Sequence, residues 1–211
     1  MADSCEYATR VMQFAKWPEP GRVKTRLMPA LGAAGALGAH VELTLAVLDN
    51  LCATGYPVEF WWDREPAGSG EDALPIVQNL QAAAIPGRIQ QGGNLGQRMA
   101  HALAGAVQDA GAGVIVGSDC PSVDADYVRR AIALLREQDV VLGPSDDGGY
   151  VLIGAGRVVP GMLDDIAWGT EAALEQTCQR LQEKGLRYAL LEPRWDVDEP
   201  EDWQRWCAYR D

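Results

Sequence analysis

Short apolar runs alternate with longer amphipathic segments along the chain. Residues 113–117, GVIVG, form an apolar run bounded by glycine, which is typical of a strand buried on both faces of a parallel sheet. Segment 27–53 instead carries apolar residues at helical spacing, including Val41, Leu45 and Leu48. The pattern predicts strands at 7–14, 58–62, 88–91, 113–117, 140–143, 150–154 and 188–191. It predicts helices at 27–53 (one or two), 95–110, 124–138 (with Ser122 as a candidate N-cap), 169–185 and 199–209.

The alternation of strands and helices predicts the fold class. It implies an α/β fold of three layers, α/β/α, with a mostly parallel, mixed and doubly wound sheet. No internal repeat, low-complexity tract or linker-like change of composition divides residues 1–211, so we expect one domain. In such sheets ligands bind beyond the carboxyl ends of the strands. The side chains that follow each strand are therefore the first candidates for a site.

Composition and charge narrow the function classes. With 47% hydrophobic and 23% charged residues, the chain has the balance of a globular protein with a substantial core. Its formal net charge of −12 would repel both a nucleic-acid backbone and an anionic membrane surface. We therefore expect small molecules as partners, and neither nucleic acid nor membrane.

Cysteine usage and the N-terminus bear on the compartment. The five cysteines are widely scattered and form no C-x-x-C pair, which argues against a disulfide framework and against a zinc site. The first residues lack the basic start and apolar run of a signal peptide. The most apolar stretch, 31–53, is interrupted by His40, Glu42 and Asp49, so we predict no membrane span and a cytoplasmic protein.

The loop after the first predicted strand gathers positive charge in an otherwise acidic chain. Prolines and Gly21 stiffen and turn it, and a helix follows. A helix N-terminus offers free N–H groups and a positive dipole end, and Arg and Lys add charge-assisted hydrogen bonds, so the loop suits phosphate. The simpler alternative is a solvated basic turn. We call residues 16–26 the basic loop; its basic residues are Lys16, Arg22, Lys24 and Arg26, against one acid, Glu19.

A P-loop kinase is excluded by spacing. The basic loop contains Lys24 followed by Thr25, as a Walker A motif does. It lacks the two glycines that G-x-x-x-x-G-K-[ST] places around the phosphates.

Asp119 follows the GVIVG run and stands before a proline turn. An acid at the tip of a buried strand is where a Mg²⁺ or Mn²⁺ ligand would lie, because these cations choose carboxylate oxygen and bridge to substrate phosphates. The equally weighted alternative is an Asx turn before the next helix. Neither His40 nor His101 marks Cys120 as a nucleophile, so we interpret Cys120 as a small buried filler.

Two further acidic segments are candidates. In 143–150, Asp146 or Asp147 could orient a hydroxyl or a metal-bound water, and Gly148 and Gly149 could let a substrate approach the backbone; a D-G hairpin turn is the favoured alternative. In 196–202, the acids and proline could simply cap a helix. Asp196 and Asp198 alternate, however, so in an extended segment both would face one side and could complete a metal site with Asp119.

Another strand-to-helix turn, 91–98, combines glycines with Arg98. It could hold a base or a phosphate, or be only a capped turn. The sequence leaves both interpretations open.

Six blocks in order resemble the DUF2064 family of proposed glycosyltransferases, which belong to the nucleotide-diphospho-sugar transferase superfamily and have the GT-A fold. The blocks cover nearly the whole chain. Each alone is weak, but the six in register make a specific match. They are F-x-K-x-P-x-P-G-x-V-K-T-R-L at 14–27, G-x-L-G-x-R-M at 93–99, G-S-D-C-P at 117–121, G-P-x-x-D-G-G-Y-x-L-I-G at 143–154, W-x-T at 168–170 and D-V-D-x-P-x-D at 196–202.

The resemblance implies a GT-A fold with a nucleotide bound over the first strand and its loop. It implies Asp119 as a catalytic residue and metal ligand, joined by Asp198 and by Asp196. The acceptor pocket would be bordered by 147–150, with Asp147 as a second catalytic residue. The substrate-binding residues that fall within the matched blocks are Lys16, Gly21, Lys24, Thr25, Arg26, Gly96, Arg98, Gly148, Gly149, Tyr150, Trp168 and Thr170.

The sequence also departs from relatives of that family. The G-x-G-x-x-R start of sugar-nucleotide pyrophosphorylases is absent, and Asp119 is followed by Cys-Pro where a D-x-D would stand. The family is also similar to guanylyltransferases that cap phospholactate-type acids, which have a related K-[ST]-R-L loop.

Three hypotheses follow for function. The first is glycosyl transfer from a nucleotide-diphospho-sugar, with Mg²⁺ or Mn²⁺ stabilising the leaving diphosphate. The second is nucleotidyl transfer from an NTP to a phosphorylated or carboxylic acceptor. The third is a non-catalytic nucleotide-binding regulator. Asp146, Asp147, Tyr150 and Trp168 suggest a neutral, sugar-like acceptor and favour the first.

Seven tryptophans suggest apolar surface that a homodimer would cover. The residues that prompt this expectation are Trp61, Trp62, Trp203 and Trp206.

Overall fold

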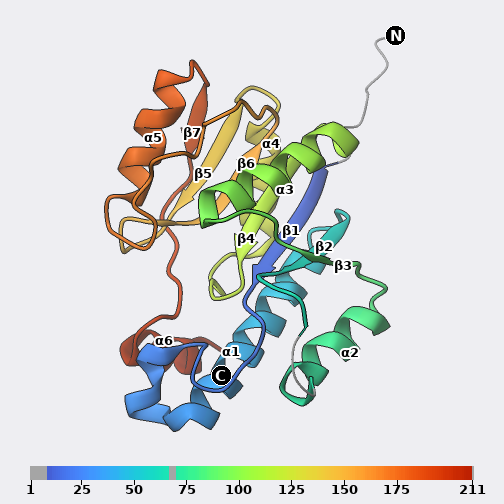
Figure 1. Ribbon diagram of the computed structural model, residues 1–211, viewed down its shortest axis with the longest axis vertical. Coiled ribbons are helices and arrows are strands. Elements are labelled where there is room, and N and C mark those ends of the chain that lie inside the picture. Colours follow the sequence, from blue (N-terminus) through green and yellow to red (C-terminus); the bar gives the residue numbers. More distant parts are fainter. Residues whose placement is uncertain (1–8, 67–69, 211) are drawn as a thin grey trace.

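A seven-stranded sheet runs through the middle of the protein (Figure 1). The computed structural model describes residues 9–66 and 70–210. Strand order is β3-β2-β1-β4-β6-β5-β7, and β6 runs antiparallel to both β4 and β5 while the other pairs are parallel. The predicted fold class is confirmed. The strands are β1 (Thr9–Ala15), β2 (Val58–Trp62), β3 (Gly87–Ile89), β4 (Ala112–Gly117), β5 (Val140–Pro144), β6 (Tyr150–Ala155) and β7 (Tyr188–Leu190).

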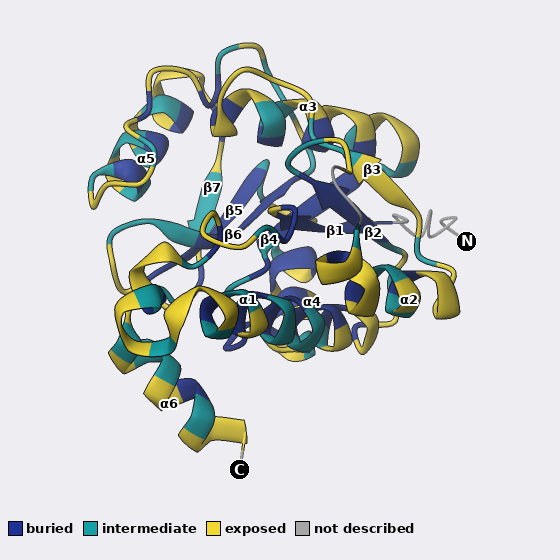
Figure 2. Cartoon of the chain, turned by 60° about the horizontal axis from the view of Figure 1, so that its bottom comes forward, coloured by how far each residue is buried: buried dark blue, intermediate teal, exposed yellow. Residues whose placement is uncertain are grey.

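Helices cover both faces of this sheet. Figure 2 shows α3 and α5 on one side, with α1, α2 and α4 on the other. The helices are α1 (Met28–Cys52), α2 (Leu74–Ala82), α3 (Leu95–Ala110), α4 (Ala125–Leu134), α5 (Ala173–Glu183) and α6 (Pro200–Arg210), with 3-10 turns η1 (Thr25–Leu27) and η2 (Glu71–Ala73).

The two faces of the sheet build two halves of the core. Successive residues of a strand point to opposite faces, so Met12 packs with Ile115 toward α3 and α5, whereas Val11 packs with Val114 toward α1 and α4. All four side chains are almost fully buried. Such close packing fixes the ends of β1 and β4 relative to each other.

Most predicted elements are present, with shifted boundaries. The helix expected from residue 169 begins at Ala173, after the turn at Gly169 with φ of 77°. Helix α2 and turn η2 were not predicted, because only Ile76 and Leu80 of α2 are buried and so short a stripe is a weak signal. Residues 7 and 8 of the first predicted strand lie outside the described residues.

The candidate N-cap of α4 was wrong. Asp124, not Ser122, caps this helix, and its side chain accepts a hydrogen bond from Tyr127 N at 2.7 Å. Ser122 Oγ instead donates to the carbonyl of Trp195. Asp124 stands directly before the first helical residue, where an N-cap carboxylate reaches the free N–H groups.

The segment 27–53 contains a kink rather than one straight helix, since Gly32 has non-helical φ and ψ of 69° and 171°. By length and composition alone, Thr25–Cys52 would suffice to span a membrane, with a mean hydropathy of 1.5 over its most apolar window. In this fold Leu43, Val47 and Leu51 are fully buried, and the helix packs against β1 and α4. Its apolar face therefore serves the core.

The chain after β7 returns along the carboxyl ends of the central strands. Val197 N donates to the carbonyl of Asp119 at 2.9 Å, and Arg194 forms a parallel bridge with Ser145. Helix α6 then packs Trp206 against Leu27 beside the start of α1 (Figure 1). This course carries the acids of 196–202 to the end of β4.

Three of the tryptophans that suggested apolar surface are buried. Trp61, Trp62 and Trp206 are each less than a tenth exposed. These side chains fill the core, so they give the expected homodimer no surface.

Candidate functional site

The basic loop and Asp119 lie side by side because they follow adjacent strands. Strands β1 and β4 pair in parallel, from Thr9 with Ala112 to Phe14 with Gly117. Their carboxyl ends open into a cavity of about 460 Å³, which we call the basic pocket. Its lining includes five cations, Lys16, Arg22, Lys24, Arg26 and Arg98, and three acids, Asp63, Asp119 and Asp198.

Among the described residues, three of these cations have no acidic partner or only an exposed one. Lys16 is exposed and makes no ion pair within the described residues. Arg98 donates through Nε to the carbonyl of Gly92 at 3.2 Å, and Arg22 meets Glu19 only at 3.3 Å on the surface. Exposed pairs of this kind contribute little to stability. The pocket therefore presents unused positive charge to an anion.

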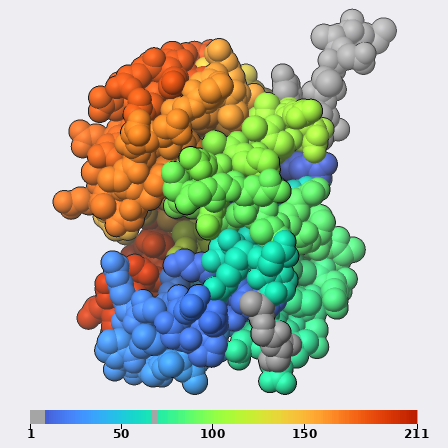
Figure 3. Space-filling view, viewed as in Figure 1, coloured from blue at the N-terminus to red at the C-terminus, as the bar shows by residue number. Residues whose placement is uncertain are grey.

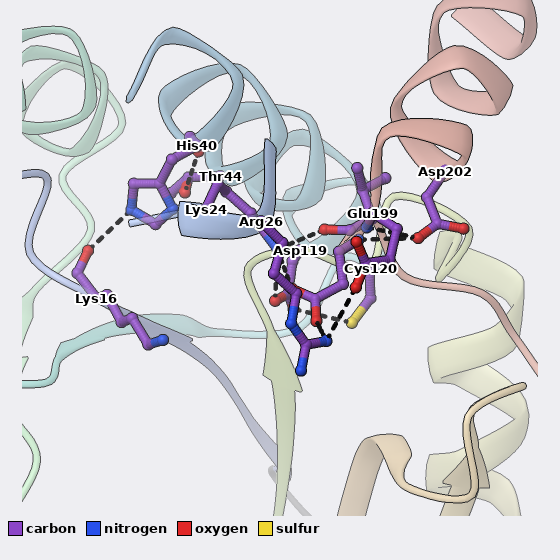
Figure 4. A network of polar contacts seen from close by, with 11 residues as sticks. Lys16, Lys24, Arg26, His40, Thr44, Asp119, Cys120, Glu199 and Asp202 are labelled. Atoms are coloured by element: carbon purple, nitrogen blue, oxygen red, sulfur yellow. Dashed lines mark hydrogen bonds and ion pairs between the residues drawn. The ribbon is translucent and has the colours of Figure 1, made fainter. Parts of the chain in front are cut away.

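Lys24 is the buried member of a polar network whose carboxylates, Asp119 and Asp198, are 40% and 45% exposed (Figure 4). Its ammonium donates to Asp119 Oδ2 at 2.9 Å and to the carbonyl of Val197, and lies 3.8 Å from Asp198 Oδ1. Only 6% of its side chain is exposed. Its backbone is left-handed, with φ of 46°, which costs energy in a non-glycine residue. The network holds Lys24 in this conformation.

Charge pairing sets the protonation of this network. Burial alone would raise the pKa of Asp119, but the Lys24 ammonium beside it more than offsets burial and lowers that pKa to about 2. Burial would lower the pKa of Lys24, yet Asp119 raises it above its ordinary value. The two groups form an ion pair at neutral pH.

Arg26 holds the other carboxylate of the network. Its guanidinium contacts Asp198 Oδ2 at 2.6 Å and Glu199 Oε1 at 3.4 Å. Asp198 lines the basic pocket, whereas Asp196 does not. Asp196 and Asp198 alternate as expected, but they line different cavities.

A second cavity of about 380 Å³, which we call the acidic pocket, adjoins the first. The two share Phe14, Lys16, Leu95, Gly117 and Asp119. Figure 3 shows a hollow between the segment near 150–170 and the start of α1. Within residues 9–66 and 70–210, the polar and aromatic lining of the acidic pocket includes Asp119, Asp147, Asp196, Tyr150, Trp168, Thr170 and, as its one cation, Lys16.

Two acids of this pocket, Asp147 and Asp196, have no cationic partner among the described residues. Asp147 Oδ1 accepts hydrogen bonds from Ser145 Oγ and from Gly149 N at 3.0 Å. Asp196 makes no ion pair among the described residues. Burial, and then the charges of Asp119 and Asp147, raise the pKa of Asp196 to about 7. An added anion would meet repulsion here.

Two of the site glycines are explained by packing. A Cβ at Gly148, whose φ is 85°, would lie 2.3 Å from the carbonyl oxygen of Glu171. One at Gly96 would lie 2.4 Å from the carbonyl oxygen of Leu163 and 2.9 Å from the Trp168 ring. Neither position has room for a side chain, so both glycines allow close packing of the segments next to the acidic pocket.

The remaining candidate residues fall into three groups. Thr25 lines the basic pocket, and Gly149 lines the acidic one. Thr170 Oγ1 donates to the carbonyl of Ala167 at 2.8 Å at the rim of the acidic pocket. Gly21 turns the basic loop with φ of 77° and lines neither cavity.

The sequence did not indicate His40 as a pocket residue. It is only 4% exposed, and its Nε2 lies 3.0 Å from the carbonyl oxygen of Lys16 (Figure 4). Burial lowers its pKa, which favours the neutral ring. A neutral Nε2–H would donate to that carbonyl and fix the start of the basic loop. Helix packing brings it there, and no local motif signals that contact.

Only two of the three carboxylates predicted as metal ligands line one pocket together. No cluster of three or more His, Cys, Asp or Glu that could hold a metal occurs in residues 9–66 and 70–210. Asp119 and Asp196 both line the acidic pocket, whereas Asp198 is paired with Arg26. Mg²⁺ commonly takes one or two carboxylates and completes its shell with substrate phosphates and water. The chemistry of Asp119 and Asp196 suits such a cation.

Comparison with protein families supports the resemblance drawn from the motifs. The model described as "Uncharacterized protein conserved in bacteria (DUF2064)" matches residues 53–170, more than half of the chain. A comparison with curated proteins gave no match.

Several solved structures have the same fold. A crystal structure from Desulfovibrio desulfuricans G20, provisionally described as a nucleotide-diphospho-sugar transferase, is 29% identical, covers 91% of this chain and 83% of its own, and has a TM-score of 0.79. CMP:2-keto-3-deoxy-manno-octonic acid synthetase complexed with CTP is 11% identical, with coverages of 96% and 98% and a TM-score of 0.60. Rv0371c from Mycobacterium tuberculosis H37Rv, in complex with manganese, is 18% identical, with coverages of 93% and 96% and a TM-score of 0.51. The last two share the fold alone.

Proposed function

The chain belongs to the DUF2064 family, and from its two adjoining pockets we propose that it is a transferase that takes a nucleotide-diphospho-sugar as donor and passes the sugar to a neutral acceptor. The single observation that carries the proposal is the contrast between these pockets, one cationic and one lined by carboxylates and aromatic rings, which meet at Lys16 and Asp119.

The basic pocket is the proposed donor site. Lys16, Arg22 and Arg98 offer positive charge that no buried acid of the described residues neutralises. A diphosphate would gain charge-assisted hydrogen bonds from such side chains. Its volume of about 460 Å³ is within the range of pockets that take small ligands. The D. desulfuricans protein, provisionally described as a nucleotide-diphospho-sugar transferase, supports this choice of donor.

The acidic pocket is the proposed acceptor site. Asp119, Asp147 and Asp196 face it, and Lys16 is the one cation among the described residues that line it. A phosphorylated or carboxylic acceptor would be repelled, whereas hydroxyl groups can donate to carboxylate oxygens. Tyr150 and Trp168, whose rings meet edge-on at 6.0 Å, supply the apolar wall that suits a sugar ring.

The proposed chemistry places the reacting atoms between the pockets. An acceptor hydroxyl oxygen attacks the anomeric carbon, the bond from that carbon to the diphosphate oxygen breaks, and the hydroxyl proton passes to the Asp147 carboxylate. Lys16 and Arg26 share the charge that develops on the leaving diphosphate. Mg²⁺ or Mn²⁺, when held by Asp119 and Asp196, would supply Lewis-acid stabilisation of the same charge.

Ligand-dependent melting tests this proposal. The panel is UDP-glucose, GDP-mannose, CTP and GTP, each with and without Mn²⁺. A ligand that binds only the folded state at ~100 times its Kd adds about 2.7 kcal/mol, so a clear rise in Tm is expected with a nucleotide-sugar. A rise with CTP or GTP alone would instead favour nucleotidyl transfer, and no rise with any nucleotide would refute the donor site. A rise without turnover of any donor would favour the non-catalytic regulator.

A matched pair of variants localises the ligand. Lys16→Met removes an exposed cation from both pockets, and we expect it to weaken donor binding about tenfold, since one hydrogen bond to a charged group contributes about 1.5–3 kcal/mol. Arg136→Met removes an exposed cation in the turn that follows α4, outside either pocket. Equal effects of the two changes in a calorimetric titration would show that net charge, not the pocket, controls binding.

A further inference from the structure

Lys24 is paired with Asp119, the carboxylate that a divalent cation would need as a ligand. Its ammonium lies 2.9 Å from Asp119 Oδ2 and 3.8 Å from Asp198 Oδ1, and it also donates to the carbonyl of Val197. Hydrogen bonds to Asp119 and Val197 use two of the three donors of the ammonium group, and the contact with Asp198 at 3.8 Å is electrostatic. A divalent cation cannot bind Asp119 Oδ2 while the Lys24 ammonium is in place. The metal ion and the ammonium would both contact that oxygen, and two cations so close together repel each other strongly.

The same side chain also lines the basic pocket. Its neighbours there, Lys16, Arg22 and Arg26, define the place where a diphosphate would lie. The Lys24 side chain has a flexible four-carbon stem, so its ammonium can change partners by rotation about that stem. A diphosphate in that pocket would offer the ammonium new anionic partners and release Asp119. Lys24 is thus within reach of both proposed ligands.

We propose that Lys24 is a built-in counter-ion that keeps divalent cations off Asp119 until a nucleotide diphosphate draws its ammonium away. Binding of nucleotide and cation is then mutually dependent, and by linkage each raises the affinity for the other by the same factor. This inference rests on the proposed donor site. It goes beyond that site by assigning Lys24 a control over the order of binding.

The contacts explain why Lys24, and not a neighbouring cation, has this role. Lys16 is exposed and has no ion pair in the described part of the chain, and Arg26 reaches Asp198 rather than Asp119. The left-handed backbone of Lys24, with φ of 46°, aims the side chain inward toward the end of β4. Lys24 alone among the basic-loop residues pairs with Asp119 in the described structure.

The test measures Mn²⁺ binding without any nucleotide. Free Mn²⁺ is quantified by electron paramagnetic resonance in titrations of wild type, Lys24→Met and Arg136→Met. We expect Lys24→Met to bind Mn²⁺ at least tenfold more tightly than wild type. Arg136→Met also removes one positive charge, but outside both pockets and with Asp119 still paired, so its Mn²⁺ affinity should stay within about twofold of wild type.

Three results would overturn the inference. They are an unchanged Mn²⁺ affinity in Lys24→Met, no measurable Mn²⁺ binding to that variant, and an equal gain in both variants, which would show a general electrostatic effect. If Lys24→Met does not fold, Lys24→Gln keeps a hydrogen-bond donor at this place and carries the same expectation.

Nucleotide titrations separate this inference from the proposed function. Calorimetry of wild type with UDP, with and without Mn²⁺, should show at least a tenfold difference in UDP affinity, and the ratio should shrink in Lys24→Met. If UDP, GDP and CTP all fail to bind wild type, the proposed donor site is wrong, while the Mn²⁺ titrations without nucleotide still decide the role of Lys24.

Discussion

The basic and acidic pockets meet at Lys16 and Asp119, yet they are assembled in different ways. Five of the seven residues from Arg22 to Met28 line the basic pocket, so much of it comes from one continuous loop. The acidic pocket draws Asp147, Trp168 and Asp196 from three distant segments. One pocket therefore depends on local sequence, and the other on tertiary packing around β6.

The difference also separates the chemistry of the two sides. Among the described residues, Lys16 and Arg22, which have no buried acidic partner, face one cavity, and Asp147 and Asp196, which have no cationic partner, face the other. A chemical group can pass from one substrate to the other at such a boundary, since each pocket selects a molecule of different charge. Variants at the boundary should affect both sides, and variants away from it only one.

Asp119→Asn is expected to have the largest effect, because Asp119 lines both pockets. The change removes the charge that pairs with Lys24 and one of the two carboxylates that suit a cation. We expect turnover of a nucleotide-sugar to fall about 1000-fold, and the Mn²⁺-dependent rise in Tm to disappear. Circular dichroism checks that the fold is retained. A variant with an unchanged Mn²⁺ response would exclude Asp119 from the cation site.

Asp147→Asn should act on the acidic side alone. Loss of a group that accepts a proton typically costs 100-fold or more in rate, so we expect kcat to fall about 100-fold. The affinity for the donor should be unchanged, because Asp147 lines only the acidic pocket. Steady-state kinetics and calorimetry with UDP measure the two quantities. Asp146→Asn is the matched control, since Asp146 lines neither pocket. A parallel loss of UDP affinity in Asp147→Asn would show that the two pockets are not independent.

Much of the fold follows from the sequence, and the reason differs between the two pockets. Val58–Trp62 and Leu95–Ala110 have the predicted boundaries because periodicity and glycine signals are local. The charges of the basic loop are contiguous, so they could be recognised as one group. His40 could not, because only the packing of α1 brings it to the carbonyl of Lys16.

The acidic residues show the same limit. Alternation predicts that Asp196 and Asp198 share a side of an extended segment. It does not predict that Arg26 pairs with Asp198 or that Asp196 lines the acidic pocket. Those assignments depend on the contact between Val197 N and the carbonyl of Asp119, which joins residues 78 positions apart in sequence.

Gly96→Ala tests whether the close packing of Gly96 against Leu163 and Trp168 shapes the acidic pocket. The new Cβ would lie 2.4 Å from the carbonyl oxygen of Leu163 and 2.9 Å from the Trp168 ring, so the ring must move. We expect a loss of about 1–3 kcal/mol in the free energy of unfolding, with a changed tryptophan fluorescence. Gly105→Ala, in the same helix, meets no atom within 4 Å and should stabilise by about 1 kcal/mol. Equal effects of the two changes in urea unfolding would contradict the packing argument.

The smallest effect is expected for Arg22→Met, which tests the basic side at its rim. Arg22 pairs with Glu19 at 3.3 Å, and 63% of its side chain is exposed. An exposed pair contributes at most about 1 kcal/mol to stability, so Tm without ligand should not change measurably. Donor affinity should fall about threefold, and the loss should vanish at high salt, since exposed charges are screened within about 3 Å at 1 M. The measurement is UDP calorimetry at 0.05 M and 1 M NaCl. A loss of donor affinity that persists at high salt would mean that Arg22 makes a close, water-excluded contact with the phosphates. The donor site would then extend further toward the basic loop than the basic pocket does.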